Sequence, residues 1–432
     1  MDGNRLPDQG GAQASPVADA GNVPAWADVR PAGARLPARA GTAVTNRVLV
    51  FRRDLLPLSE TFVRQQALGL REWQATVVGH RRVPDGLDLA GLAAHLVGAG
   101  AGGWLDHLAW SAFRLASWPE PASLRALRNT GAALVHVHFA TDAVSAWPWL
   151  RYLDLPVVVT LHGYDITIDP EWWTAGKGGA AHRAYPGRLR ALAGESRVSF
   201  IAVSEAIRQR AIAAYGIPAG KIKVLHIGVD NSVFTPGPVA IGARASKVLF
   251  VGRQVEKKGL PVLILAMRQV QRRLPDAELV VVGDGPLHEA SAQMAAGLGV
   301  NARFLGAQPS TMVRQLLDEA RVLCLPSITA ANGDAEGFGL VLLEAQACGV
   351  PVVTSAKGGR EEGIRHGITG FAFAEADHAA LVGHLSKVLT DDALATSMGR
   401  EAVRFVAERF SLADCTLALE RYYTRLSYRH AR

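Results

Sequence analysis

Apolar and polar positions along the chain alternate between two kinds of pattern. Short runs rich in Val, Ile and Leu are separated by longer stretches in which apolar residues recur with helical spacing. Such runs are typical of strands that are buried on both faces of a parallel sheet. The strands expected in a first series are "RVLVF" at 47, "ATVVGH" at 75, "LVHVHF" at 134, "PVVVTLHG" at 156, "SFIAVS" at 199 and "IKVLHIG" at 222.

A second series of the same kind follows a polar interruption. The stretch "FTPGPVAIGARAS" at 234–246 contains Pro and Gly and is the best linker candidate. Because strand–helix–strand repetition produces parallel strands covered by helices, the chain is predicted to form two doubly wound α/β domains. The strands expected in the second series are "KVLFVGR" at 247, "ELVVVGDGP" at 278, "ARFLGA" at 302, "RVLCLPS" at 321, "VPVVTS" at 350 and "TGFAFA" at 369.

These patterns divide the chain into five parts. Residues 1–45 are rich in Gly, Ala and Pro without periodicity and are predicted to be a flexible leader. Two Rossmann-like domains are expected at 46–235 and 247–405, joined by a linker at 236–246. Residues 406–432 are expected to form a helix that packs back across the domains, and a membrane-surface stripe is the second interpretation. Ligands of such sheets bind beyond the carboxyl ends of the strands, so the two sheets should face each other across a cleft.

Composition narrows the class of protein. A chain of 432 residues with 49% hydrophobic and 20% charged residues fits two globular domains. Its three cysteines, Cys324, Cys348 and Cys415, have neither metal-ligand spacing nor an even number, which favours a reducing cytoplasm. No apolar signal region and no run of eighteen apolar residues occurs, so we expect a protein that is neither exported nor membrane-spanning.

The chain carries an excess of basic residues, which is larger in its first half. The net charge is +7, and residues 46–240 contain 20 Lys or Arg against 15 Asp or Glu. An anionic substrate or an anionic membrane surface would suit this excess, although an ordinary solvated basic surface is the favoured interpretation. No nucleic-acid-binding module is recognisable, so nucleic acid is not an expected partner.

The stretch "GDAEGFGLVLLEA" at 333–345 has the pattern of a glycine loop that leads into a helix. A helix start offers unpaired backbone N–H groups, and glycines let a phosphate approach them. Glu344 would lie more than one turn into the helix among aliphatic residues, where an unpaired charge is costly, so it should have a ligand or partner. The plain alternative is an amphipathic helix with Glu344 in water and Glu336 in an ordinary loop.

Three further stretches end predicted strands with polar residues. "VGRQVEKKGL" at 251–260 places two cations, Arg253 and Lys258, where they could balance the charge of a diphosphate. "VVGDGP" at 281–286 forms a tight turn, and "LHGYD" at 161–165 ends a strand with His162. No Asp-x-Asp sequence occurs, so we expect cationic side chains rather than a metal ion at the phosphate, and no cofactor.

In this order and spacing, the motifs resemble the retaining GT-B glycosyltransferases of family four from about residue 47 to the C-terminus. The second half carries "VGR" and "KKGL", "VVGDGP", "FLG" at 304–306, "LPS" at 325–327 and "EGFGLVLLE" at 336–344. In the first half, "LPLSETFV" at 56, "VHVHFATD" at 135, "TLHGYDI" at 160 and "HIGVD" at 226 are similar to members that build exopolysaccharides. The resemblance implies hexosyl transfer from a nucleotide-diphosphate sugar by two Rossmann-like domains.

The resemblance also implies roles for individual residues. Glu336 would contact hydroxyls of the transferred sugar, Glu344 would bind the nucleotide ribose, and His162 would lie next to the reacting sugar. Arg253 and Lys258 match the phosphate-binding pair of the family, and His162, Glu336, Arg253 and Lys258 are the expected catalytic residues. The donor-binding set is Gly252, Arg253, Lys258, Gly283, Glu336, Gly337, Phe338, Gly339, Leu340 and Glu344; the acceptor-binding set is Ser59, Glu60, Thr61 and His138.

Two motifs, "HIGVD" at 226–230 and "GGREEG" at 358–363, depart from the family pattern. His226 stands where Asn is common, and Arg360 and Glu361 stand where an apolar residue and Pro are usual. These departures bear on sugar or acceptor preference rather than on the class.

Two other functions use the same frame, a nucleotide-sugar epimerase and a catalytically idle sugar-binding subunit. The motif set favours a transferase over both. A dehydrogenase is the least favoured function, because no Gly-x-Gly-x-x-Gly follows the first strand. The expected partners are a nucleotide-sugar donor and a sugar, lipid-linked or small-molecule hydroxyl acceptor. The expected place is the cytoplasm, with peripheral attachment to the inner membrane face if the acceptor is lipid-linked.

Overall fold

The computed structural model describes residues 46–57, 60–83, 86–97 and 121–430. The predicted leader at 1–45 lies outside them. The N-terminal domain contains a parallel seven-stranded sheet in the order β5-β3-β1-β6-β7-β8-β9. Its strands are β1 (Asn46–Phe51), β3 (Trp73–Gly79), β5 (Ala93–Leu96), β6 (Leu134–His138), β7 (Val157–Leu161), β8 (Val198–Ala202) and β9 (Ile222–Val224).

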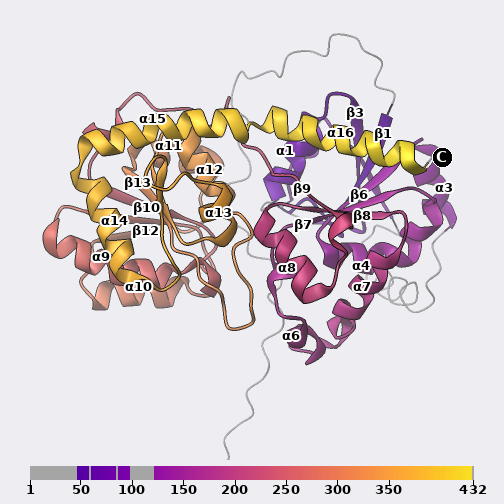
Figure 1. Cartoon of the computed structure of the whole chain (residues 1–432), viewed down its shortest axis with the longest axis horizontal. Helices are drawn as coiled ribbons and strands as arrows, with labels where there is room; N and C mark the ends of the chain where they lie inside the picture. Colours follow the sequence, from indigo (N-terminus) through magenta and orange to yellow (C-terminus); the bar gives the residue numbers. More distant parts are fainter. Residues whose placement is uncertain (1–45, 58–59, 84–85, 98–120, 431–432) are drawn as a thin grey trace, which may run out of the picture.

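Helices cover both faces of this first sheet (Figure 1). The central strands β1, β6, β7 and β8 are mostly apolar and buried on both sides, which explains why they form the centre of a layered domain. The helices of the domain are α1 (Thr61–Gly69), α3 (Pro121–Asn129), α4 (Ala140–Leu150), α5 (Tyr164–Thr167), α6 (Pro170–Thr174), α7 (Tyr185–Gly194) and α8 (Glu205–Tyr215).

The C-terminal domain repeats this architecture with a parallel six-stranded sheet in the order β12-β11-β10-β13-β14-β15. Its strands are β10 (Lys247–Val251), β11 (Glu278–Val282), β12 (Ala302–Phe304), β13 (Val322–Leu325), β14 (Val352–Thr354) and β15 (Gly370–Ala372). Its helices are α9 (Leu260–Arg273), α10 (His288–Gly297), α11 (Ser310–Glu319), α12 (Leu340–Ala347), α13 (Lys357–Glu362), α14 (His378–Thr390) and α15 (Asp392–Arg409).

Each apolar run expected to be a strand contains one, and the predicted fold class is confirmed. The sequence pattern missed β2 (Asp54–Leu55), β4 (Arg81–Arg82) and β5. The first two strands are two residues long, and β5 has exposed or half-buried side chains, so none of them produces a buried apolar run.

The last helix, α16 (Leu412–His430), returns from the C-terminal domain to the N-terminal one (Figure 1). Its buried side chains Leu419, Tyr423 and Leu426 complete the core on one face of the first sheet. The buried carboxylate of Glu420 accepts the backbone N–H groups of residues 71–73 at 2.7, 2.8 and 3.0 Å. A buried charge is stable there because three donors replace its water.

The topology places the loops that follow the strands in a definite position. In each sheet the chain order reverses around one strand, β1 between β3 and β6, and β10 between β11 and β13. Such reversals open a crevice at the carboxyl ends of the strands. The segments that follow β1, β6, β7, β10 and β13 are therefore the ones from which a site can be built.

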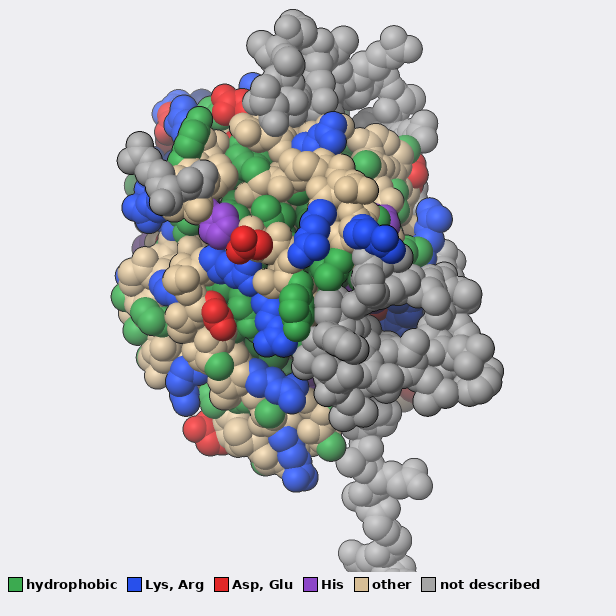
Figure 2. All heavy atoms as spheres, turned by 90° about the vertical axis from the view of Figure 1, so that its right-hand side faces the viewer, with side chains coloured by type: hydrophobic (Ala, Val, Ile, Leu, Met, Phe, Trp, Pro, Cys, Tyr) green, Lys and Arg blue, Asp and Glu red, His purple; other side chains and the backbone are tan. Residues whose placement is uncertain are grey.

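The end of the N-terminal domain that points away from the C-terminal domain is rich in Lys and Arg on its described surface (Figure 2). Arg128 donates to the carbonyl of Tyr152 at 2.6 Å, and Arg197 donates to the carbonyl of Arg151 at 2.5 Å.

The described part of the chain has no helix with the length and apolar content needed to cross a membrane.

Candidate active site

The loop before α12 has the form expected of a phosphate seat. Helix α12 begins at Leu340, directly after Gly339, as the glycine pattern predicted. Among the described residues, no group accepts a hydrogen bond from the backbone N–H groups of Phe338, Gly339 or Leu340. These are the free donors of a helix start, where the helix dipole also favours an anion.

Glu336 precedes this helix start and is paired with a lysine. Nζ of Lys258 donates to the Glu336 carboxylate, and both side chains are largely buried. Burial acts to raise the pKa of Glu336, but the charges of Lys258 and Lys257 and hydrogen bonds from Lys258 and Gly337 lower it below its ordinary value. The structure thus brings together two predicted site residues from β10 and β13 loops as a charged pair.

Arg253, the second predicted cation, lies exposed just beyond β10. No hydrogen bond or ion pair of its side chain occurs within the described residues, so its guanidinium is available to an anion. Gly252, the residue before Arg253, packs against Gly283. A Cβ at Gly283, where φ is +115°, would lie 2.1 Å from the carbonyl oxygen of Gly252. Close packing of these two strand-end loops therefore requires a glycine at 283.

Glu344 lies in α12, and its predicted ligand or partner stays a prediction. It is half-buried, and no described residue forms a hydrogen bond or ion pair with its side chain. Burial alone raises the pKa of Glu344 to about 7. A carboxylate in this position would gain from hydroxyl donors supplied by a ligand.

The N-terminal domain meets this loop directly at His162, which follows β7. A Cβ at Gly337 would lie 2.2 Å from the carbonyl oxygen of His162, so only glycine permits this backbone contact. Ser204 caps the start of α8 and also donates from Oγ to the carbonyl of Gly337 at 2.7 Å. The predicted catalytic histidine and the predicted donor loop are thus neighbours across the domain boundary.

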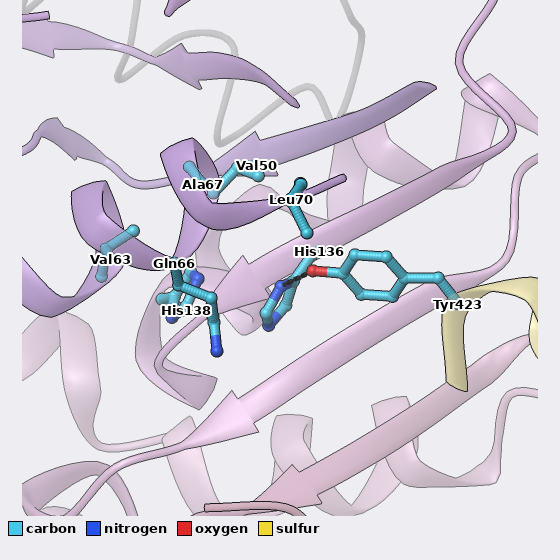
Figure 3. Close-up of a pocket in the computed structure, with 8 residues that line it drawn as sticks. All are labelled: Val50, Val63, Gln66, Ala67, Leu70, His136, His138 and Tyr423. Atoms are coloured by element: carbon cyan, nitrogen blue, oxygen red, sulfur yellow. Dashed lines mark hydrogen bonds between the residues drawn. The ribbon is translucent and has the colours of Figure 1, made fainter. Parts of the chain in front are cut away.

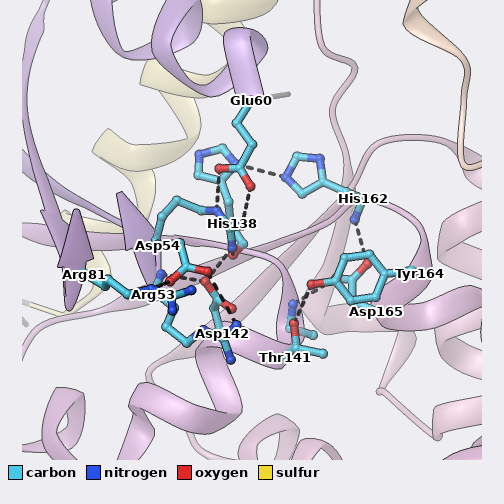
Figure 4. Close-up of polar contacts among 12 residues, drawn as sticks. Arg53, Asp54, Glu60, Arg81, His138, Thr141, Asp142, His162, Tyr164 and Asp165 are labelled. Carbon is cyan, nitrogen blue, oxygen red and sulfur yellow. Dashed lines mark hydrogen bonds and ion pairs between the residues drawn. The ribbon is translucent and has the colours of Figure 1, made fainter. Parts of the chain in front are cut away.

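A buried polar network surrounds His162 on the N-terminal side (Figure 4). The guanidinium of Arg52 bonds both carboxylate oxygens of Glu60 and lies 2.5 Å from Oδ2 of Asp142. Asp165 accepts the backbone N–H groups of Ala140 and Gly163 at 2.8 and 2.9 Å. These bonds fix the segments that follow β1, β6 and β7 against one another.

Two predicted acceptor contacts are corrected by this network. Glu60 is 5% exposed and its carboxylate is occupied by Arg52, so it holds the site together instead of facing an acceptor. His138 is 2% exposed and lies behind His162, so an acceptor does not reach its ring. Thr61 is half-buried at the start of α1 and remains a prediction, and Ser59 lies outside the described residues.

Three residues of the network carried no predicted role. Asp142 and Asp165 stood inside the quoted motifs "VHVHFATD" and "LHGYD", and Arg52 directly follows the first strand. Charged residues just after buried strands are the signal that could have identified them, because those positions converge at the edge of a parallel sheet.

His226, which stands where the family commonly has Asn, lies at the domain boundary. Its Nε2 lies 3.4 Å from Oε2 of Glu362, and Glu362 also accepts the backbone N–H of Glu205 at 2.6 Å. The His226 ring packs against Phe338, with centroids 5.4 Å apart. This residue therefore joins the two domains beside the helix start.

The two facing Rossmann-like domains define the GT-B class of glycosyltransferase folds. The Anabaena protein HepE, solved in complex with UDP, has the same fold, with a TM-score of 0.69 and 20% identity over 88% of this chain and 100% of that one. Sucrose-phosphate synthase from Thermosynechococcus elongatus aligns with a TM-score of 0.69 and 20% identity over 88% of this chain and 99% of its own.

Sequence comparison identifies the family. The model described as Glycosyltransferase Family 4 matches residues 59–233, and the model described as Glycosyl transferases group 1 matches residues 238–405. The chain belongs to the family 4 glycosyltransferases.

Curated relatives match part of the chain. A GDP-mannose-dependent phosphatidylinositol monomannoside mannosyltransferase of Mycolicibacterium smegmatis is 35% identical over 46% of this chain and 54% of its own length. The amylovoran biosynthesis glycosyltransferase AmsK of Erwinia amylovora is 35% identical over 43% of this chain and 46% of its own. The chain spans about half the length of these relatives.

The pKa of Glu344 leads to a stability prediction. Because its folded pKa of about 7 lies above the ordinary value of 4.5, the unfolded chain loses this proton first as pH rises. Stability contributed by the protonated form is therefore lost between about pH 4.5 and 7. We expect Glu344→Gln to raise the Tm by roughly 2–5 °C at pH 8 and by much less at pH 5. The exposed Glu408→Gln on α15 is the control, and an equal shift at both pH values would contradict the prediction.

Proposed function

We propose that the protein is a retaining glycosyltransferase that moves a sugar from a nucleotide-diphosphate sugar to a hydroxyl acceptor. The observation that carries this proposal is the placement of the Glu336–Lys258 pair beside a free helix start and against His162 of the opposite domain. A nucleotide-diphosphate sugar needs a carboxylate to bind its sugar hydroxyls. Its phosphates need a cation and backbone N–H groups.

In the proposed site each part of the donor has a partner. The N–H groups of residues 338–340 and the side chains of Arg253 and Lys258 bind the diphosphate, and the two cations balance its charge as it leaves. Glu336 binds the sugar hydroxyls, and Glu344 binds the ribose. His162 lies next to the reacting sugar on the side of the N-terminal domain. An oxygen of the leaving phosphate accepts the proton of the acceptor hydroxyl, so attack and departure occur on one face and the configuration is retained.

The relatives guide the choice of substrates to test. Their names include a mannosyltransferase that depends on GDP-mannose and enzymes of amylovoran and colanic acid biosynthesis, and solved structures of the same fold contain UDP or UDP-glucose. We infer a role in the biosynthesis of a polysaccharide, glycolipid or glycosylated natural product. Thermal stabilisation by a panel of UDP-, GDP- and dTDP-sugars, followed by transfer assays, tests this assignment. Interconversion of the donor without an acceptor would instead identify an epimerase.

Removal of the phosphate cations tests the diphosphate clamp. We expect Lys258→Ala and Arg253→Ala each to lower kcat by a factor of about 100, the effect of losing one preorganised charge. Lys247→Ala is a matched control, since Lys247 begins the same strand β10 and forms a surface pair with Glu319 at 2.7 Å. Variants that keep circular dichroism and stay within a few-fold of the wild-type rate would rule out the clamp.

Substitutions of Glu336 and Glu344 should change different kinetic parameters. Glu344→Gln should mainly raise the donor KM, because a ribose contact persists throughout the reaction and acts as uniform binding. Glu336→Gln should mainly lower kcat, because its hydrogen bonds orient the sugar that reacts. Steady-state kinetics and Tm are measured together for both variants. If the losses of activity only parallel a lower Tm, the two residues contribute to stability and not to donor binding or turnover.

We propose that transfer needs no metal ion, because Arg253 and Lys258 supply the positive charge at the diphosphate. Activity should therefore be undiminished by EDTA, measured as initial rate after dialysis against the chelator. Complete loss of activity that manganese restores would overturn this assignment of the phosphate site.

We also propose peripheral attachment to an anionic membrane through the basic end of the N-terminal domain (Figure 2). Attraction between exposed charges is screened by salt, so high salt should release the protein from a washed membrane fraction. Immunoblots of the soluble and pelleted fractions measure the release. A protein that stays in the pellet until detergent is added would refute electrostatic attachment.

A further inference from the structure

The ring of His138 supports the ring of His162 from behind (Figure 4). His138 is the register partner of Thr160, and His162 lies two residues beyond Thr160, so both histidines project from the same face of neighbouring strands. Nδ1 of His138 lies 2.9 Å from Nε2 of His162, and the two rings stack at 5.2 Å. This hydrogen bond occupies one nitrogen of the predicted catalytic histidine.

Burial favours the neutral form of both rings. Burial, followed by the charge of Arg52 and interaction with His136, holds the pKa of His162 well below its usual value, and burial does the same for the pKa of His138. The charged groups packed around the pair have other partners. Arg52 engages Glu60 and Asp142, while Asp165 accepts backbone N–H groups. Among the described residues, no carboxylate bonds either imidazole.

A hydrogen bond between two neutral imidazoles links their tautomers. Each ring carries one N–H, and one ring must donate while the other accepts. If Nδ1 of His138 donates, His162 must carry its hydrogen on Nδ1 and present a donor. If Nε2 of His162 donates, its Nδ1 presents an acceptor. The position of the hydrogen on His138 thus decides which kind of group His162 offers to a sugar.

His138 itself is held in place from the other side (Figure 3). The ring of His136 packs on it with centroids 4.2 Å apart. His136 in turn bonds the hydroxyl of Tyr423 at 2.5 Å and Oγ1 of Thr160 at 2.6 Å. The side chains that support His162 therefore extend through two layers of histidine to the C-terminal helix α16.

We propose that His138 is a positioning residue that fixes the tautomer and the orientation of His162. Nδ1 of His162 then meets the transferred sugar or the acceptor in a single hydrogen-bonding form. This inference rests on the proposed transferase function, because it assigns His138 a task only through His162.

Two substitutions separate hydrogen bonding from packing. His138→Phe keeps a ring of similar shape but cannot bond Nε2 of His162, whereas the side-chain amide of His138→Asn reaches the position of Nδ1. We expect the Phe variant to lose about 10–100-fold in kcat, because a small misplacement of a group beside the reacting atoms can cost about 100-fold, with donor KM changed less than about threefold. The Asn variant should stay within about fivefold of wild type. The opposite order, with Phe more active than Asn, would show that His138 only fills space.

A double-mutant cycle tests whether the effect passes through His162. In a His162→Ala background, His138→Phe should cause no further loss of kcat. Independent, multiplying losses in the double variant would overturn the proposal. A His162→Ala variant with wild-type activity would instead contradict the assigned role of His162 and leave the donor site to be judged by its own variants.

Imidazole nitrogen NMR of the full chain gives a readout that needs no activity. In the wild type, His162 should give the shifts of one neutral tautomer from pH 8 to pH 5.5, assigned by comparison with His162→Ala. In His138→Phe, the same signals should move to the average of two tautomers. A tautomer mixture in the wild type, or a His162 spectrum unaffected by His138→Phe, would refute the proposal even if no donor had been identified.

Discussion

The contact between the backbones of Gly337 and His162 is the constraint around which the rest of this structure is arranged. A methyl group at Gly337 would lie 2.2 Å from the His162 carbonyl oxygen, so the loop of one domain touches the other without any intervening side chain. Ser204 adds a hydrogen bond to the carbonyl of Gly337, and Thr167 bonds Asp334 at 2.6 Å nearby. His162 directly follows β7 and Ser204 caps the start of α8, while Gly337 and Asp334 lie in the loop between β13 and α12, so loops at the carboxyl ends of the two sheets meet here.

Helix α16 connects the C-terminal domain to the core of the N-terminal domain. Its residues close the core on one face of the N-terminal sheet, and the buried Glu420 accepts three backbone N–H groups at the start of β3. Removal of such an acceptor would leave several buried N–H groups unpaired, which costs far more than a surface contact. The core of the N-terminal domain is thus completed by the last helix of the chain, which follows the whole C-terminal domain.

Sequence reasoning predicted the layers well because burial on both faces of a parallel strand leaves a local signal in the sequence. It also located the start of α12 and the cations after β10, since glycines and charges at strand ends mark loops. It failed where the outcome depends on partners far apart in sequence. Glu60 and His138 look alike as polar residues near an edge, and only Arg52 and His162 in three dimensions show that their polar groups point inward.

The pairing of Lys258 with Glu336 in the free protein has a consequence for the end of a catalytic cycle. In the proposed site, an intact donor gives each of the two a new partner, phosphate for the lysine and sugar hydroxyls for the glutamate. After transfer, the nucleotide diphosphate that remains still attracts Lys258 but offers nothing to Glu336. The carboxylate would then compete with the product for the same ammonium group, and this competition would favour release of the nucleotide diphosphate.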